Sequence, residues 1–230
     1  MAWRSSGATN AELVNNLASA GILSSQRVMD AFRKTNRLHY VQEKRRAYED
    51  SPSSIGHGAT ISAPHMHAYA AEALAPFLRM SGSVLDVGSG SGYLAAVFHR
   101  MLAAAGADGK VVGIDHIPQL VVQSEQNLAA DGLSDALKSD AIRLVCGDGR
   151  QGWAQGSPYR VIHVGAAAAE IPSKLVEQLA PGGRMFIPVE DASGPGQHIW
   201  QVDKDSEGRV TQQEVMGVMY VPLTDRAKQR

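Results

Sequence analysis

A glycine-rich turn is the clearest candidate for a ligand site in this sequence. It runs from Asp86 to Gly92 and follows a short apolar segment at 83–87. Its glycines permit positive φ angles and let backbone atoms approach a ligand closely. In open α/β sheets, ligands bind beyond the carboxyl ends of the strands, which is where this turn is expected. A tight strand-to-helix turn without a ligand is the alternative that the turn alone leaves open.

Two carboxylates strengthen the ligand interpretation. Asp115 ends the next apolar segment, 110–115, where its side chain can accept hydrogen bonds from both hydroxyls of a ribose. Asp148 follows a third apolar segment, 142–146, from which a side chain can reach an adenine amino group. For Asp148, a turn residue that stabilises its own backbone is the alternative. Together the two positions favour a ligand that contains adenosine.

The spacing of the glycines separates two classes of cofactor. A dinucleotide fingerprint is usually G-x-G-x-x-G, with the pyrophosphate at the helix N-terminus. Here Gly88, Gly90 and Gly92 place the third glycine one residue early, and Asp86 would bring negative charge near that pyrophosphate. S-adenosylmethionine has no phosphate, and its ammonium and sulfonium groups are cationic. The turn with Ser89 therefore predicts an S-adenosylmethionine-dependent methyltransferase rather than a nicotinamide oxidoreductase.

Alternating strands and helices are expected to position these residues. Amphipathic helices separate predicted strands at 83–87, 110–115, 142–146, 159–164 and 184–189. This alternation implies right-handed crossovers and a parallel, doubly wound sheet. Two extended stretches, 197–203 and 210–221, follow with no helix between them and predict an antiparallel pair at the sheet edge. The expected fold is α/β, a mostly parallel seven-stranded sheet of the Rossmann-like, class I methyltransferase type.

The first sixty residues are predicted to form helices and a loop. Capping-box spacing from Thr9 to Glu12 indicates a helix that Gly21 can close, and Ser24 or Ser25 can begin a second helix.

A loop is predicted over 43–62, and loops of this length in a compact chain are often functional. Pro64 fits the first turn of the helix that follows. We expect one domain, 1–230, in which 1–62 supplies N-terminal helices and a substrate loop. The remainder, 63–230, is expected to form the cofactor-binding core.

Composition excludes several classes of protein. The 230 residues are 44% hydrophobic, and 22 basic against 23 acidic residues give a net charge of -1. Such a balance offers no basic excess for nucleic acid or an anionic membrane. No run approaches the ~20 apolar residues of a membrane span, and the first six residues do not form a signal peptide. Cys146, the single cysteine, ends an apolar strand and is expected to be buried. We expect a cytoplasmic, soluble monomer.

Longer stretches of the chain resemble one family. They are residues 1–5, 54–56, 59–67, 85–92, 113–116, 147–150, 163–167 and 221–225. The chain resembles the protein-L-isoaspartate (D-aspartate) O-methyltransferases of the eukaryotic type over nearly its whole length. The most specific stretch is 60–64, Thr-Ile-Ser-Ala-Pro, because many methyltransferases share the glycine turn.

The resemblance implies a reaction and its partners. The family transfers a methyl group from S-adenosylmethionine to the α-carboxylate of L-isoaspartyl residues, or to D-aspartyl side chains, in damaged proteins and peptides. S-adenosylhomocysteine is the product. The ester then collapses to a succinimide without the enzyme, and hydrolysis of the succinimide returns some normal aspartate.

The resemblance also implies site residues. Ser62 matches the family's active-site serine. Cofactor contacts are expected at Ala59, Thr60, Ile61, Ser62, His67, Asp86, Gly88, Ser89, Gly90, Gly92, Asp115, His116, Gly147, Asp148, Thr224 and Gln229. Substrate contacts are expected at Ala59, Thr60, Ser62, His67, Val164, Gly165 and Val221.

The chemistry of a carboxylate acceptor agrees with this set. A carboxylate is already ionised at neutral pH, with an ordinary pKa of about 4, so its methylation needs no general base. It needs alignment with the sulfonium methyl group and a partly dry pocket. Ser62 can supply an orienting hydroxyl; its alternative role is a cap on the helix that begins near Pro64.

Other interpretations carry less weight. His57, His65 and His67 have no cysteine or carboxylate nearby at ligand spacing, so no metal is expected. A methyltransferase for small carboxylates is the second enzyme hypothesis. A cofactor-binding adaptor is the third; such relatives carry long C-terminal extensions, which are not expected in a chain that ends at Arg230. Residues 166–170 and 192–196 depart from the family pattern and are expected to border the peptide groove.

Overall fold

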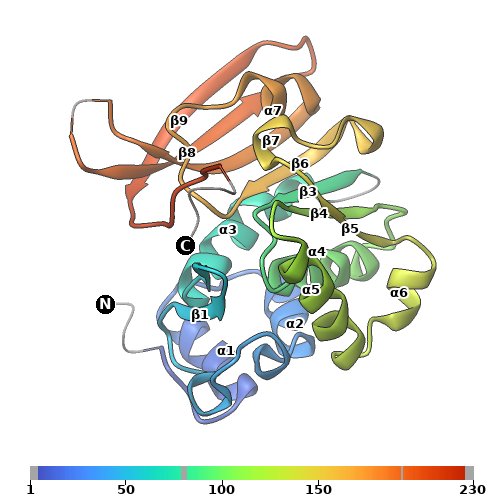
Figure 1. Ribbon diagram of the computed structural model, residues 1–230, viewed down its shortest axis with the longest axis vertical. Helices are drawn as coiled ribbons and strands as arrows, with labels where there is room; N and C mark the ends of the chain where they lie inside the picture. Colours follow the sequence, from blue (N-terminus) through green and yellow to red (C-terminus); the bar gives the residue numbers. More distant parts are fainter. Residues whose placement is uncertain (1–4, 79–81, 193, 226–230) are drawn as a thin grey trace.

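The computed structural model describes residues 5–78, 82–192 and 194–225. Within them one sheet has the strand order β5-β4-β3-β6-β7-β8-β9 (Figure 1). Its strands are β3 (Ser83–Val87), β4 (Val111–Asp115), β5 (Ile142–Cys146), β6 (Tyr159–Val164), β7 (Leu179–Glu190), β8 (Gln197–Lys204) and β9 (Val210–Gly217). The first five are parallel neighbours, and β8 and β9 add antiparallel pairs at the edge. The predicted seven-stranded, mostly parallel sheet is confirmed.

Helices cover both faces of the sheet. They are α1 (Asn10–Ser19), α2 (Gln26–Lys34), α3 (Pro64–Leu74), α4 (Tyr93–Ala104), α5 (Pro118–Ala130), α6 (Ser134–Lys138) and α7 (Ser173–Gln178). Short 3₁₀ turns occur at Arg37–His39, Lys44–Arg46, Ala75–Phe77, Gly149–Gln151 and Ala154–Gly156. Figure 1 shows α1 to α5 on one side of the sheet and α7 on the other. Successive residues of β3 alternate accordingly, with Val84 in one hydrophobic cluster and Leu85 in the other. The doubly wound arrangement is confirmed.

The N-terminal helices begin where capping predicts. Thr9 Oγ1 accepts from Glu12 N (3.2 Å), and the Glu12 carboxylate accepts from Ala8 N (2.9 Å). Gly21 follows α1 with a φ of +73°, which is the left-handed conformation that glycine adopts freely. α2 begins directly after Ser25. These helices share one hydrophobic cluster with α3, α4 and α5, so the N-terminal layer packs as part of the main core.

The predicted loop at 43–62 contains a hairpin that sequence reasoning missed. Strands β1 (Ser53–Gly56) and β2 (Ala59–Ile61) pair antiparallel. The turn residues His57 and Gly58 both have positive φ, at +54° and +68°. Positive φ at both central residues is the signature of a two-residue hairpin turn. The strands are too short for a periodicity signal, which is why the prediction of an unbroken loop was wrong here.

Several predicted boundaries shift. Leu179 begins β7 directly after α7, and Lys204 Nζ donates to Val176 O (2.6 Å) and Leu179 O (2.7 Å) at the helix end. The last extended stretch forms a strand only as far as Gly217, after which Val218 N still donates to Gln197 O (2.8 Å).

The helix from Pro64 ends at Leu74 and continues as a 3₁₀ turn that contains Pro76, a residue without an N–H to donate. The short helix α6 had no recognised signal.

Cys146 is exposed, so the expectation of burial was wrong. β5 is the outer strand of the sheet, and its burial is partial along its length. An apolar strand at an edge therefore does not guarantee a buried end. Among the described helices none has the length and apolarity needed to span a bilayer.

Candidate active site

The glycine turn lies between the carboxyl ends of β3 and β4. Gly88, Gly90 and Gly92 have φ angles of +70°, +51° and +82°, as the sequence predicted. Gly88 N and Ser89 N both donate to Ile114 O, at 2.8 and 3.1 Å. The turn is therefore held against β4, and Gly92 leads directly into α4.

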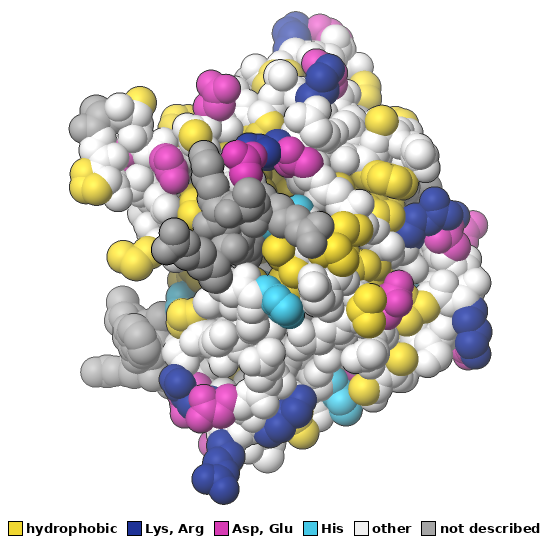
Figure 2. Space-filling model, viewed as in Figure 1, with side chains coloured by type: hydrophobic (Ala, Val, Ile, Leu, Met, Phe, Trp, Pro, Cys, Tyr) yellow, Lys and Arg dark blue, Asp and Glu magenta, His cyan; other side chains and the backbone are white. Residues whose placement is uncertain are grey.

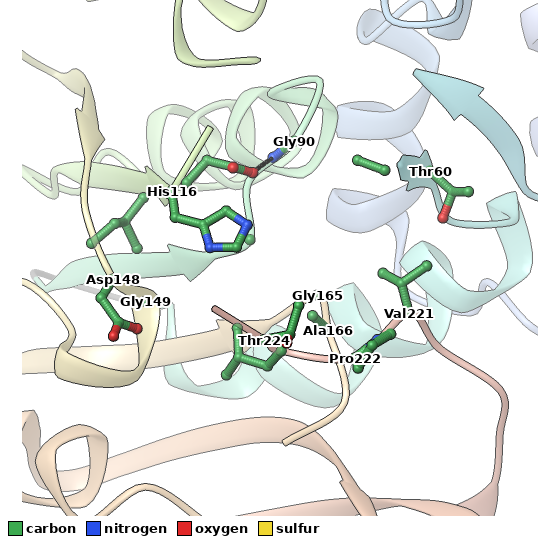
Figure 3. Close-up of a pocket in the computed structure, with 15 residues that line it drawn as sticks. Thr60, Gly90, His116, Asp148, Gly149, Gly165, Ala166, Val221, Pro222 and Thr224 are labelled. Atoms are coloured by element: carbon green, nitrogen blue, oxygen red, sulfur yellow. Dashed lines mark hydrogen bonds between the residues drawn. The ribbon is translucent and has the colours of Figure 1, made fainter. Parts of the chain in front are cut away.

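Asp115 supports this turn from the end of β4. Its Oδ2 accepts from Gly90 N (3.0 Å), and its Oδ1 accepts from Ile117 N (2.9 Å), so the carboxylate fixes the tip of the glycine turn (Figure 3). The side chain is buried, and burial raises its pKa, although the Ile117 and Gly90 N–H groups act in the opposite direction. Each oxygen keeps a lone pair for a further donor.

A first pocket opens between the glycine turn and the segment after β9. Figure 3 shows its residues converging from both sides, with Gly90, His116 and Asp148 facing Thr224, Pro222 and Val221. Its walls are Ala59, Thr60, Gly88, Gly90, Ile114, Asp115, His116, Asp148, Gly149, Gly165, Ala166, Val221, Pro222, Leu223 and Thr224. Apolar walls with two carboxylates suit a nucleoside.

Asp148 has the turn-stabilising role that the sequence offered as an alternative, and it also lies in the pocket wall. It caps the 3₁₀ turn that follows it, with Oδ1 accepting from Arg150 N (3.0 Å). The Arg150 guanidinium lowers the Asp148 pKa, and it also donates to Asp225 Oδ1 (2.6 Å). The pair joins the pocket wall to the segment after β9.

A second, smaller pocket adjoins the first. It is lined by Thr60, Ile61, Ser62, His67, Asp86, Gly88, Ser89, Gly90, Ser91, Tyr93, Leu94, His163 and Gly165. Thr60, Gly88, Gly90 and Gly165 belong to both pockets, so the two form one continuous site.

A buried carboxylate makes the second pocket acidic on one side. Asp86 Oδ1 lies 2.7 Å from His163 Nδ1, while Asp86 Oδ2 is buried and makes no hydrogen bond within the described residues. A buried carboxylate oxygen without a partner is costly. It fits a ligand ammonium group, as on the amino-acid end of S-adenosylmethionine. The donor set of the two pockets thus fits that cofactor.

Ser62 lies between β2 and α3, where it lines the second pocket. The cap of α3 is Ala63 and no side chain caps this helix, so a capping role for Ser62 is wrong. The hydroxyl of Tyr220 bonds to the Ser62 side chain, and burial raises the pKa of Tyr220 to about 12. Ser62 O accepts from Arg37 Nη2 (2.7 Å).

The predicted site residues fall into three groups. Those found in the pocket walls are Ala59, Thr60, Ile61, Ser62, His67, Asp86, Gly88, Ser89, Gly90, Asp115, His116, Asp148, Gly165, Val221 and Thr224. Gly92, Gly147 and Val164 lie in neither wall; Val164 is fully buried at the end of β6. Gln229 lies outside the described residues.

Sequence reasoning missed other residues of the site. His163 had a usable signal, since it is a polar residue inside an apolar strand beside the glycine turn. Arg37 and Tyr220 had none, because their contacts with the site depend on the tertiary fold. His65 pairs with Asp50 (2.8 Å), and the described residues contain no group of three potential metal ligands. Residues of both departing stretches, Ala169, Glu170 and Ala192, line one surface groove.

Comparison with known proteins gives the class of enzyme first. A Plasmodium falciparum protein assigned as a protein-L-isoaspartate O-methyltransferase, solved with S-adenosyl-L-homocysteine, matches with a TM-score of 0.86 and 30% identity. The match covers 94% of this chain and 98% of that chain. With the glycine turn and the two pockets, it defines a Rossmann-like, S-adenosylmethionine-dependent methyltransferase.

Sequence comparison then gives the family. The profile of the protein-L-isoaspartate(D-aspartate) O-methyltransferases matches residues 8–228. The protein-L-isoaspartate O-methyltransferase of Caenorhabditis elegans is 48% identical, over 100% of this chain and 98% of its own length. Protein-L-isoaspartate O-methyltransferase 1 of Arabidopsis thaliana is 46% identical, over 96% and 93%. The chain belongs to the protein-L-isoaspartate(D-aspartate) O-methyltransferase family, and it methylates L-isoaspartyl residues with S-adenosylmethionine as the donor.

Proposed function

We propose that the chain works as a single-domain, monomeric protein-repair enzyme of the cytosol, with Ser62 as the residue that aims the acceptor carboxylate. The observation that carries the role of Ser62 is its place in the second pocket, in the same wall as Asp86 and the glycine turn. A carboxylate held there lies at the amino-acid end of the cofactor site. Its partners are damaged proteins and peptides.

The two pockets divide the cofactor between them. The first suits adenosine: Asp115 at the end of β4 accepts from the ribose hydroxyls, and Asp148 reaches the adenine amino group. The second suits the methionine part, with Asp86 Oδ2 opposite the ammonium group. When bound, S-adenosylmethionine supplies an electrophilic methyl group on its sulfonium.

The chain's own task is orientation and the exclusion of water. The acceptor carboxylate is already ionised, so no residue needs to remove a proton. The Ser62 hydroxyl, which contacts Tyr220, donates to one carboxylate oxygen and leaves the other free to attack. Opposite charges are neutralised as the bond forms, so the apolar walls from Ile61 and Leu94 favour the reaction. Collapse of the resulting ester to a succinimide needs no residue of the chain.

Surface composition supports the monomeric, cytosolic part of the proposal. The large apolar side chains exposed among the described residues, Val122, Val210, Val215 and Met219, are spread over α5, β9 and the segment after it. Figure 2 shows basic and acidic side chains next to one another over the face it presents. Neither feature suits a subunit interface, nucleic acid or an anionic membrane. A mass near 24.5 kDa in light scattering is the corresponding measurement.

Substrate choice is tested with a matched pair of peptides. Tritiated S-adenosylmethionine is offered with one peptide sequence in its isoaspartyl form and in its normal aspartyl form. We expect label in the isoaspartyl peptide only. In isoaspartate the chain continues through the side-chain carboxyl, so the α-carboxylate is free, whereas in a normal aspartyl residue the α-carboxyl forms the peptide bond. A D-aspartyl version measures the second expected substrate. Equal labelling of the pair would overturn the proposal, and labelling of free small carboxylates alone would favour the second enzyme hypothesis.

Removal of the Ser62 hydroxyl is expected to reduce turnover rather than cofactor affinity. Loss of one hydrogen bond to a charged group corresponds to about 1.5–3 kcal/mol, so Ser62→Ala should lower kcat by roughly 10- to 150-fold. The Kd for S-adenosylhomocysteine should change by less than about threefold. Titration calorimetry and single-turnover kinetics measure both, with Ser54→Ala in β1 as the control. A large loss of cofactor affinity with normal kcat at saturation would show that Ser62 serves the cofactor instead.

A further inference from the structure

A buried arginine lies behind the second pocket. Arg37 is 1% exposed, and it comes from the 3₁₀ turn after α2, far in sequence from the rest of the site. Its Nη2 donates to Ser62 O at 2.7 Å, and its Nη1 lies 3.4 Å from His67 Nδ1. Its Nε makes no hydrogen bond within the described residues. No carboxylate within salt-bridge distance of Arg37 is found among those residues, so a charge has been buried at high cost.

The contact with His67 determines where the imidazole carries its proton. A guanidinium can only donate, so His67 Nδ1 must accept and cannot itself be protonated. The neutral ring therefore carries its proton on Nε2. The His67 ring is 5.0 Å from the Tyr93 ring, and Tyr93 also lies 5.4 Å from the Arg37 guanidinium carbon. His67 thus lies against one cation and one aromatic ring, and it lines the second pocket.

The groups around His67 keep it uncharged. Burial is the largest cause that lowers its pKa, followed by the positive charge of Arg37 and then by His163 of β6 and His65 of α3. Asp50, which pairs with His65 N and Nδ1, is the carboxylate that acts on Arg37. A neutral histidine with a fixed N–H is a reliable hydrogen-bond donor at every pH from mildly acidic upward.

We propose that Arg37 is a positioning residue for methyl transfer, which holds His67 as the Nε2–H tautomer facing the carboxylate of the cofactor's methionine part. Through its second contact it also fixes the Ser62 peptide, so one buried guanidinium places a cofactor-binding group and the acceptor-orienting serine. The inference rests on the proposed cofactor orientation. Arg37 touches neither ligand and acts through these two residues.

The tautomer can be read in the unmodified chain. Two-dimensional NMR of ¹⁵N-histidine-labelled protein, bound to S-adenosylhomocysteine, should show His67 as the neutral Nε2–H form at pH 6.5, the ordinary pKa of histidine. An Nδ1–H tautomer, or a His67 pKa at or above the ordinary value of 6.5, would overturn the inference. This measurement involves no methyl acceptor, so its outcome is independent of the substrate assay.

Arg37→Met removes the cation while it keeps an unbranched side chain. We expect the His67 pKa to rise, the single tautomer to be lost, and the Kd for S-adenosylhomocysteine to increase about tenfold or more. At saturating cofactor, kcat should fall as well, because the Ser62 peptide is released. Arg37→Lys keeps the charge but has one nitrogen in place of the two that contact His67 and Ser62. It should restore the low His67 pKa but only part of kcat.

Arg100→Met is the matched control. Arg100 is also largely buried, it donates to Asp131 Oδ2 (2.6 Å) and Thr35 Oγ1 (2.8 Å), and it lines neither pocket. We expect this variant to lower the melting temperature and leave the His67 titration unchanged. If folded Arg37→Met binds the cofactor and titrates like the parent, Arg37 is a packing residue only and the inference is wrong.

Discussion

Replacement of Asp115 by alanine is expected to abolish cofactor binding at micromolar concentrations. Asp115 holds the glycine turn through Gly90 N and its own loop through Ile117 N, and we propose that it also accepts from the ribose. Each lost hydrogen bond to a charged acceptor corresponds to about 1.5–3 kcal/mol. With two ribose hydroxyls, the Kd for S-adenosylhomocysteine should rise by roughly 10²- to 10⁴-fold. Titration calorimetry gives this ratio directly.

Two further variants separate the causes of that loss. Asp135→Ala removes the same charge from a side chain that is 99% exposed on α6, and it should leave the Kd unchanged. Asp115→Asn keeps one acceptor oxygen for a backbone N–H, and it should bind more tightly than Asp115→Ala. Adenosine and S-adenosylhomocysteine share the ribose, so loss of the ribose contact should weaken both by similar factors. Very different factors would show that Asp115 acts mainly by holding the glycine turn.

The pH dependence of cofactor binding should follow the same carboxylate. Burial raises the Asp115 pKa, so this side chain becomes protonated at a higher pH than an exposed aspartate does. A protonated carboxyl loses acceptor capacity. Affinity should therefore be constant above that pKa and decline as the pH falls through it.

The positions of the glycine turn and of the two carboxylates at strand ends could be predicted because they depend on local sequence. The turn at Gly88–Gly92, Asp115 and Asp148 each follow an apolar run, and such runs end at one edge of a parallel sheet. The strand bounds at 83–87, 142–146 and 159–164 agree with the structure for the same reason. β3 and β6 are buried along most of their length and leave a continuous apolar signal, whereas the outer strand β5 is only partly buried.

The supporting contacts could not be predicted, because they join segments distant in sequence. Arg37 reaches Ser62 and His67 only after α2 has packed against α4. Tyr220 reaches Ser62 only after the chain has crossed back over the sheet. Gln197 Nε2 and Oε1 hold the backbone of Tyr220 there (3.2 and 2.6 Å), a clamp with no local signature. The exposure of Cys146 likewise depends on strand order, which periodicity does not determine.

The core beneath the second pocket should be the most sensitive part of the fold. Phe98 of α4 is fully buried, and its ring lies 6.2 Å from the ring of His163, the partner of Asp86. Phe98→Ala removes most of an aromatic ring from a packed site, which typically lowers the free energy of unfolding by about 3–5 kcal/mol. That is a large share of the ~5–15 kcal/mol available to a domain. Urea denaturation, followed by circular dichroism, measures the change.

Cofactor should recover part of the stability that Phe98→Ala loses. A ligand that binds only the folded state adds about 2.7 kcal/mol at a concentration one hundred times its Kd. Phe98→Leu should cost much less than Phe98→Ala because it leaves a smaller cavity, and Val122→Ala, at a side chain that is 53% exposed on α5, should cost under about 0.5 kcal/mol. If Phe98→Ala lowered the free energy of unfolding as little as Val122→Ala, the strand backbone alone would determine the position of His163. In that case the Asp86–His163 pair would not depend on the packing of α4 against the sheet.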